Sequence, residues 1–129
     1  MTGKKIYFLF FFVLLFCNTS KLLAQENNAQ NKIYQKALAA FEQKDFPTSI
    51  KILESLLEKN QKNAEATLFL FQVYAESRQY QKSINAFEKL IQIDSSIFLP
   101  YIVKYASEYA ILGNYTKAAG ILQEFQNKN

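Results

Sequence analysis

The chain has 129 residues, of which 50% are hydrophobic and 16% aromatic, and it holds three glycines and two prolines. This composition excludes a disordered chain and predicts one compact, core-forming domain with a short appendage. Three of the four net positive charges lie in residues 1–24, because from Gln25 onward there are twelve Lys and Arg against eleven Asp and Glu. A nearly neutral domain excludes nucleic acid as an expected partner, since such binding depends on neutralising phosphates.

Residues 1–24 have the order of regions of a secretory signal peptide. Lys4 and Lys5 precede an apolar run over residues 6–17, and polar residues then lead to the small Ala24. The run is shorter than the roughly 20 residues of a transmembrane helix. We therefore expect a signal peptide that is cut after Ala24, and an exported protein that is periplasmic or secreted.

Two alternatives would tether the chain to a membrane. In one, residues 6–17 stay uncleaved as an anchor. In the other, Cys17 carries a lipid, although Phe16 stands where the bacterial lipid-attachment pattern has Gly, Ala or Ser. After Ala24 there is no cysteine, so stability has to come from packing and not from disulfides.

The rest of the chain predicts a polar linker over residues 25–29 and then six helices, because apolar residues recur at helical spacing. The first helix covers about 30–43, and the second has Pro47 in its first turn and ends at residues 59–63. The other four cover about 64–77, 81–93, 97–112 and 116–126. Asp94 and the following serines offer N-cap chemistry for the fifth helix. Gly113 stands at its C-terminus, where a residue with positive φ is favoured.

A repeat of about 34 residues runs through these helices. Phe46, Tyr80 and Tyr115 follow one another at intervals of 34 and 35 residues. Each is followed three residues later by a small residue, which is Ser49, Ser83 or Ala118. We expect the small residues at close helix crossings and the aromatic rings wedged between a turn and a neighbouring helix. This period is typical of helix-turn-helix repeat arrays.

Residues 30–129 therefore resemble three tandem tetratricopeptide repeats, over about 30–63, 64–97 and 98–129. The third repeat matches the family's positions at Ala106, Tyr109, Gly113, Tyr115 and Ala118, and Leu122 takes an aromatic position. The second matches at Tyr74, Tyr80, Ser83 and Phe87, and the degenerate first at Ala37, Ala40, Phe46, Ser49 and Leu53. The family's early Trp is replaced by Ile33, Thr67 and Ile102. The resemblance implies an all-α αα-hairpin repeat solenoid with six helices in three antiparallel pairs.

The residue types argue against catalysis. Histidine is absent and Cys17 is the single cysteine, so the common general bases, thiol nucleophiles and zinc ligands are missing. The acidic residues are scattered, and Glu54, Glu58, Glu88 and Glu124 stand where a helix faces water. The three glycines form no phosphate-binding loop. We expect no enzyme, no cofactor and no metal site.

The resemblance implies instead a protein partner, bound as a peptide segment or a helix in a concave groove formed by the first helix of each pair. The groove residues would be Tyr34, Leu38, Phe41, Leu68, Gln72, Glu76, Val103, Lys104, Ser107 and Ile111. The alternative for Tyr34, Leu38 and Phe41 is that they complete the core. One subgroup of the family grips C-terminal carboxylates. Its positions hold Tyr34, Leu38, Phe69, Pro100 and Lys104 here, so that clamp is not expected.

An apolar cluster at the start of the fifth helix is larger than one helix face can bury. It consists of Phe98, Leu99, Tyr101, Ile102 and Val103. Either a neighbouring molecule covers part of it or the third pair is irregular. The first functional hypothesis is therefore an adaptor or assembly subunit. The alternatives are a self-associating structural module and a membrane-tethered scaffold in the cell envelope.

Overall fold

The computed structural model describes residues 28–127 of the chain. The predicted signal peptide, its cleavage after Ala24 and the lipidation alternative at Cys17 lie outside these residues. The chain divides into two units, Met1–Ile33 and Tyr34–Asn129. Of the first unit, residues 28–33 are described and are helical. Residues 28 and 29, which the sequence placed in a polar linker, are therefore helical.

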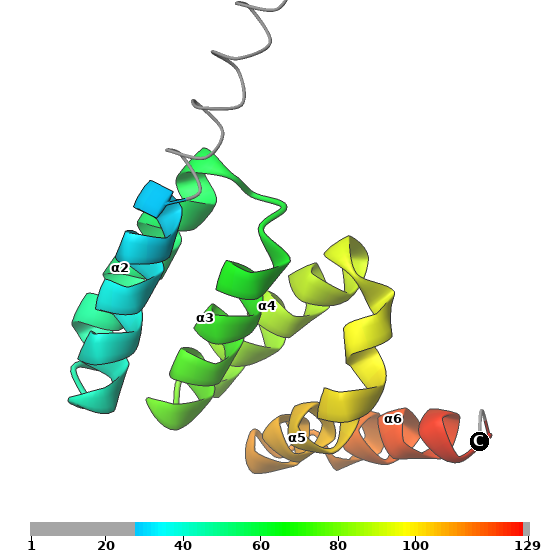
Figure 1. Ribbon diagram of the computed structural model, residues 1–129. Coiled ribbons are helices and arrows are strands. Elements are labelled where there is room, and N and C mark those ends of the chain that lie inside the picture. The colour runs from blue at the N-terminus through cyan, green and yellow to red at the C-terminus, as the bar shows by residue number, and fades with distance from the viewer. Residues whose placement is uncertain (1–27, 128–129) are drawn as a thin grey trace, which may run out of the picture. The chain divides into compact units, whose positions relative to one another are not determined.

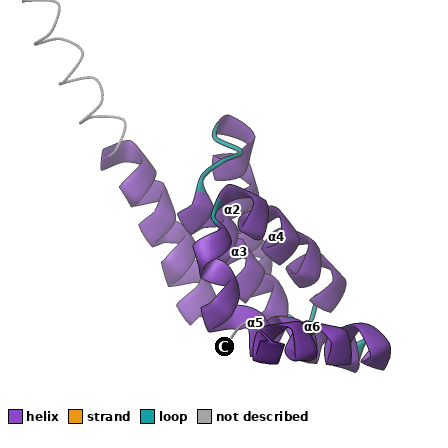
Figure 2. Cartoon of the chain, turned by 90° about the vertical axis from the view of Figure 1, so that its right-hand side faces the viewer, coloured by secondary structure: helices purple, strands orange, loops and turns teal. Residues whose placement is uncertain are grey.

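The second unit is built from helices alone within the described residues. It begins with helical residues 34–42. Then follow α2 (Phe46–Lys59), α3 (Ala64–Glu76), α4 (Tyr80–Ile93), the short 3-10 helix η1 (Ser95–Ile97), α5 (Phe98–Ile111) and α6 (Tyr115–Asn127). Each helix packs on the next along the chain, from α2 to α6 (Figure 1). Short loops join them (Figure 2). The predicted all-α fold of antiparallel helix pairs is confirmed.

The turn inside each pair has the same backbone geometry three times. Lys44, Arg78 and Gly113 have φ values of 60°, 61° and 81°. In each turn the following N–H donates to a carbonyl five residues earlier, as when Asn114 N donates to the Tyr109 oxygen at 2.8 Å. This pairing satisfies carbonyl groups that the end of a helix leaves free. The predicted positive φ of Gly113 is confirmed, and its two equivalents reach the same conformation without glycine.

Short polar side chains cap the N-termini of α2, α3, α6 and η1, whereas α4 and α5 begin without a side-chain cap. Asp45 accepts a hydrogen bond from Thr48 N at 3.2 Å, and Asn63 accepts one from Ala66 N at 3.0 Å. Asn114 caps α6 by accepting from Lys117 N at 3.2 Å. Asp94 accepts from Ser96 N and so begins η1, whereas the sequence had assigned this cap to the longer helix. These bonds satisfy N–H groups that have no partner within the helix.

The core is continuous along the pairs and rich in aromatic rings. Phe71 and Phe87 are fully buried, and their ring centroids lie 4.8 Å apart. The Tyr105 ring of α5 also lies 4.8 Å from Phe87, so the core continues from the second pair into the third. Leu53 of α2 and Ile102 of α5 are also buried. Such rings contribute large apolar area and favourable edge contacts.

The small residues at the repeat positions lie where the helices cross closely. Ser49, Ser83 and Ala118 are all buried. The two hydroxyls also donate hydrogen bonds that spacing alone does not predict. Ser49 Oγ bonds to the Ala37 carbonyl at 2.9 Å and Ser83 Oγ to the Phe71 carbonyl at 3.0 Å, in each case twelve residues back. The repeat therefore includes a recurring side-chain bond within a pair.

The aromatic repeat positions behave differently from pair to pair. The Phe46 ring is half-buried, 5.9 Å from Phe41, and Tyr80 is half-buried. Tyr115 is 71% exposed, so its ring does not fill the wedge that the sequence predicts. The physical reason is coverage: α2 and α4 are each followed by another pair in the described chain, whereas α6 is the last described helix.

Candidate partner-binding surface

The predicted groove residues of the first pair pack against α3. The Tyr34 ring lies 5.2 Å from the Phe69 ring and the Phe41 ring 5.5 Å from it, with Phe69 buried. Tyr34, Phe41 and Leu38 are all half-buried. Burial, together with the charge of Glu65, raises the pKa of the Tyr34 hydroxyl. Tyr34 and Phe41 thus complete a core cluster and leave one edge to solvent.

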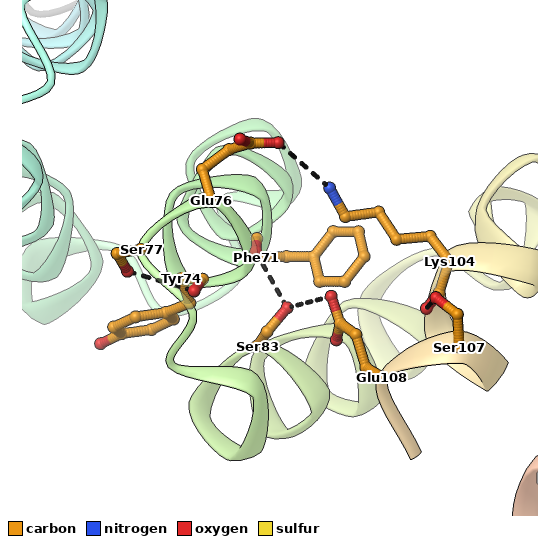
Figure 3. A network of polar contacts seen from close by, with 8 residues as sticks. All are labelled: Phe71, Tyr74, Glu76, Ser77, Ser83, Lys104, Ser107 and Glu108. Carbon is orange, nitrogen blue, oxygen red and sulfur yellow. Dashed lines mark hydrogen bonds and ion pairs between the residues drawn. The ribbon is translucent and has the colours of Figure 1, made fainter. Parts of the chain in front are cut away.

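The α3 residues of the predicted groove lie on the partly exposed side of that helix. Leu68 and Gln72 are half-buried and Glu76 is exposed. Glu76 reaches toward the third pair, because its Oε1 lies 4.0 Å from the Lys104 Nζ of α5 (Figure 3). That ammonium also lies 5.5 Å from the centre of the Phe71 ring. Helices α3 and α5, the first helices of their pairs, therefore meet at this charged edge.

Helix α5 exposes an apolar row. Leu99, Val103 and Ile111 are 49%, 66% and 58% exposed, and Ser107 between them is also exposed. We call Leu99, Val103, Ser107 and Ile111 the α5 row. Their spacing of four residues places them along one side of an α-helix. The Ser107 hydroxyl donates to the carbonyl of Lys104 at 2.7 Å. Large apolar side chains exposed in such a row are typical of an interaction surface.

The apolar cluster at the start of α5 divides between the two sides of the helix. Ile102 is buried, and the Tyr101 ring lies 5.9 Å from Phe71. The Phe98 ring stacks 6.4 Å from Phe87. Leu99 and Val103 take the opposite side and belong to the α5 row. The third pair is thus regular at this point, and the cluster exceeds what the chain itself buries.

A second exposed apolar area lies at the end of α5 and on α6. Leu112 is 48% exposed and Leu122 39% exposed. Phe87, the equivalent of Leu122 one repeat earlier, is fully buried. We call Leu112, Tyr115 and Leu122 the outer face of the third pair. The equivalent positions of the preceding pair are less exposed, because Phe87 is fully buried and Ser77 and Tyr80 are half-buried.

Tyrosine hydroxyls of one pair bond to glutamates of the preceding pair. Tyr74 donates to Glu54 Oε1 at 2.6 Å, and Tyr109 and Tyr105 donate to Glu88 Oε1 at 2.8 and 2.9 Å. Burial, followed by the hydrogen bond to Glu54 and its charge, raises the pKa of Tyr74. Glu54 and Glu88 face water as expected, yet they also link neighbouring pairs.

The buried carboxyl of Glu108 was missed by the sequence reasoning. It is 2% exposed, and its Oε1 lies 3.0 Å from Ser83 Oγ (Figure 3). Burial raises the pKa of Glu108, while the Ser83 hydroxyl and the charge of Lys104 act in the opposite direction. A signal was available, because Glu108 follows the buried Tyr105 by three residues and so lies on the apolar side of the helix.

Other kinds of site find little support in the described chain. Within residues 28–127, no three His, Cys, Asp or Glu side chains are grouped as metal ligands. Two open surface hollows, one beside Lys62 and Lys89 and one beside Lys117 and Gly120, are lined by none of the predicted groove residues. In the same part of the chain, no helix combines the length and apolar character that crossing a membrane requires.

Comparison with known proteins agrees with this architecture. Residues 40–96 match the family described as tetratricopeptide repeat. No curated protein matches the chain in sequence. Solved structures do match, and the chain spans about half the length of the solved chains concerned.

Three of these structures carry the name MamA. The first, titled crystal structure of MamA protein, is 24% identical, with a TM-score of 0.64. The match covers 70% of this chain and 49% of the MamA chain. MamA 41-end from Desulfovibrio magneticus RS-1 is 19% identical, with a TM-score of 0.63. The match covers 74% of this chain and 53% of the MamA chain. A further crystal structure of MamA is 24% identical, with a TM-score of 0.64. The match covers 74% of this chain and 58% of that MamA chain. Such likeness establishes the fold, which is the all-α helix-pair fold of tetratricopeptide repeats.

Proposed function

We propose that the chain is a protein-interaction module, an adaptor or assembly subunit, that binds an apolar segment or helix of a partner protein on the α5 row. The observation that carries this proposal is the exposure of Leu99, Val103 and Ile111 on one side of a helix whose other side is packed. Covering these side chains would remove apolar area from water, which contributes about 25 cal/mol per Å².

The geometry of the α5 row suits a helix or an extended segment with regularly spaced apolar residues. Four residues of α-helix advance by about 6 Å, so Val103 lies about 6 Å from Leu99 along the axis and about 12 Å from Ile111. An amphipathic partner helix presents apolar residues at intervals of this kind. Lys104 and Glu76 lie beside the row and offer one charge of each sign. Such charges contribute more to the orientation of a partner than to its affinity.

A site-specific cross-link tests this function. A photoreactive residue at Val103 of the full chain, expressed in its own cells, is expected to form an adduct with another protein. The matched control is the same residue at Lys89, which is exposed on α4. The adduct should disappear in Leu99→Glu, Ile111→Glu chains that keep their helical circular dichroism. The absence of a Val103 adduct, or the same adduct from Lys89, would contradict the proposal.

We further propose that the protein is exported, on the basis of the signal-like residues 1–24. Mass spectrometry of the mature N-terminus is the test, and a start at Gln25 is the expected result. A retained N-terminus, or a lipid on Cys17, would replace the exported soluble form with the membrane-tethered one. Neither outcome depends on the α5 row.

Self-association is a second candidate function, and the outer face of the third pair favours it. Leu122 and Tyr115 are exposed where Phe87 is buried and Tyr80 is half-buried one repeat earlier, so a further helix pair could stack there. A second copy of the chain would supply such a pair. Molecular mass should then rise with concentration and return to the monomer value in Leu122→Glu. A constant monomer mass would exclude this candidate.

A further inference from the structure

The hydroxyl of Ser83 lies between two acceptors. Its Oγ is 3.0 Å from the carbonyl oxygen of Phe71 and 3.0 Å from Glu108 Oε1 (Figure 3). A serine hydroxyl has one proton and a carbonyl oxygen has none, so Ser83 donates only one of these two bonds. Both bonds form together when the Glu108 carboxyl is protonated and donates to Ser83 Oγ. The heavy-atom geometry therefore matches an uncharged Glu108.

The first pair shows which of the two bonds is the basic one. Ser49 is equivalent to Ser83 and bonds to the Ala37 carbonyl at 2.9 Å across the same twelve residues. Val73 is the equivalent of Glu108 one repeat earlier. It is fully buried, and its side chain cannot accept a hydrogen bond from the serine hydroxyl. The serine-to-carbonyl bond is thus the constant feature of the repeat, and the carboxyl is an addition of the third pair. This assigns the Ser83 proton to the Phe71 carbonyl.

The second oxygen of the carboxyl shows that its surroundings do not suit a charge. Glu108 Oε2 is buried and has no hydrogen-bond partner among the described residues. An ionised carboxylate would leave this oxygen without a donor, and a buried charge without donors is strongly unfavourable. An uncharged carboxyl pays a much smaller desolvation penalty. Burial accordingly raises the pKa of Glu108 above its ordinary value of 4.5.

The charged side chains of α4 and α5 that have described contacts also have partners other than Glu108. Lys104 lowers the pKa of Glu108 but also lies beside Glu76 of α3 and the Phe71 ring. On α4, Glu88 accepts from Tyr105 and Tyr109, and Lys82 lies over the Tyr74 ring. The buried side chains of α6 are Ala118 and Ile121, which do not titrate. No described contact supplies Oε2 with a proton donor.

We propose that Glu108 is a proton-binding site in the joint between the second and third helix pairs, and that the packing of α5 on α4 weakens as the bound proton is lost. The unfolded chain loses this proton near pH 4.5 and the folded chain at a higher pH. Between the two values the unfolded state binds fewer protons, so stability falls as pH rises. The stabilisation is complete below pH 4.5. It is lost as the pH rises from 4.5 through the pKa that Glu108 has in the folded chain.

The first test compares the unfolding of the full chain by urea with that of Glu108→Gln across this pH range. Glutamine keeps the shape and a donor but does not titrate. Above pH 4.5 the unfolding constant of the wild type should rise relative to that of Glu108→Gln by up to about tenfold per pH unit. Glu108→Val introduces the residue that Val73 supplies at the equivalent position one repeat earlier. This variant should also lack the pH dependence of the wild type. Parallel curves for wild type and both variants would overturn the proposal.

The second test needs no variant. The isotope-labelled side-chain carboxyl of Glu108 is followed by NMR in the folded full chain as pH changes. We expect a titration midpoint clearly above 4.5, together with shifts of the Ser83 and Phe71 amide signals at the same midpoint. A midpoint at or below 4.5 in the folded chain would overturn the proposal even if the variants failed to fold.

Discussion

The second pair, α3 and α4, and the third pair, α5 and α6, follow the same plan but bury their equivalent positions to different extents. Phe87 is fully buried, whereas Leu122, 35 residues later, is 39% exposed. Tyr80 is half-buried and its equivalent Tyr115 is mostly exposed. The same repeat position therefore serves as core when another pair covers it and as surface when none does. Repeat spacing predicts the backbone, and coverage decides the role of the side chain.

The two pairs also differ inside. Val73 is a fully buried apolar residue of the core, and Glu108 occupies the same repeat position as a buried carboxyl. An apolar residue holds its joint at any pH. A buried carboxyl stabilises the packing between two helix pairs only while it is protonated. The third pair thus combines an uncovered apolar surface with a titratable carboxyl at its contact with the second pair.

The largest effect is expected from the ring that connects the two pairs. Phe87→Ala removes contacts with Phe71 and Tyr105, whose ring centroids both lie 4.8 Å away, and should cost about 3–5 kcal/mol of unfolding free energy. Its counterpart Leu122→Ala should cost less, about 1–2 kcal/mol, because 39% of Leu122 is already exposed to water. Urea unfolding measures both values. Similar losses for the two variants would mean that the outer face is as well packed as the core.

Next come the turns, where one pair has glycine and the other does not. Gly113→Ala should lower stability by about 1 kcal/mol, because alanine disfavours positive φ. No atom lies within 4 Å of the added Cβ, so the loss reports backbone conformation alone. The reverse change, Arg78→Gly, should raise stability by a similar amount of about 1 kcal/mol. Thermal unfolding gives both shifts, and shifts of the same sign would contradict the shared turn geometry.

A smaller effect is expected from the tyrosine hydroxyls that link successive pairs. Tyr74→Phe removes the 2.6 Å bond to Glu54 and should cost about 1 kcal/mol. Tyr109→Phe should cost less, because Tyr105 still donates to the same Glu88 oxygen. Chemical unfolding at one pH compares the two. A larger loss for Tyr109→Phe would show that the two bonds to Glu88 are not interchangeable.

The smallest effect concerns the charged edge between the pairs. Glu76→Gln removes an ion pair whose atoms lie 4.0 Å apart and whose side chains are solvent-exposed to a considerable extent. Such pairs contribute less than about 0.5 kcal/mol on average. Urea unfolding at low and high salt should therefore give nearly the same stability as the wild type. A loss that high salt abolishes would assign this edge a larger share in holding α5 to α3.

The sequence predicted the backbone well, because the helix signals are local or periodic. The spacing of Phe46, Tyr80 and Tyr115 places the turns, and Gly113 identifies a positive φ. The serines were predicted as small residues at crossings, but their bonds to carbonyls depend on a hydroxyl direction that spacing does not specify. The α5 row contains three of the predicted groove residues, Val103, Ser107 and Ile111, whereas Tyr34 and Phe41 belong to the core cluster around Phe69.

Glu108 was missed for a different reason. Acidic residues on helices usually face water, and this expectation held for Glu54, Glu58 and Glu88. Whether one of them is buried depends on which side of α5 meets α4, and a shift of a single residue changes the answer. The position of Val73 in the preceding repeat carried the relevant information, because equivalent positions share their burial when both joints are covered.

The central claim is that the packing of the third pair on the second depends on a protonated Glu108, whereas the packing of the second pair on the first depends on no such proton. Native-state hydrogen exchange tests this claim most directly. Opening free energies of single amides are compared at about pH 5 and about pH 8, after correction for intrinsic exchange rates. The structure predicts that amides of α5 and α6 lose protection at the higher pH, that amides of α2 and α3 change little, and that Glu108→Gln removes the difference. An equal change in all helices, or none in any, would contradict it.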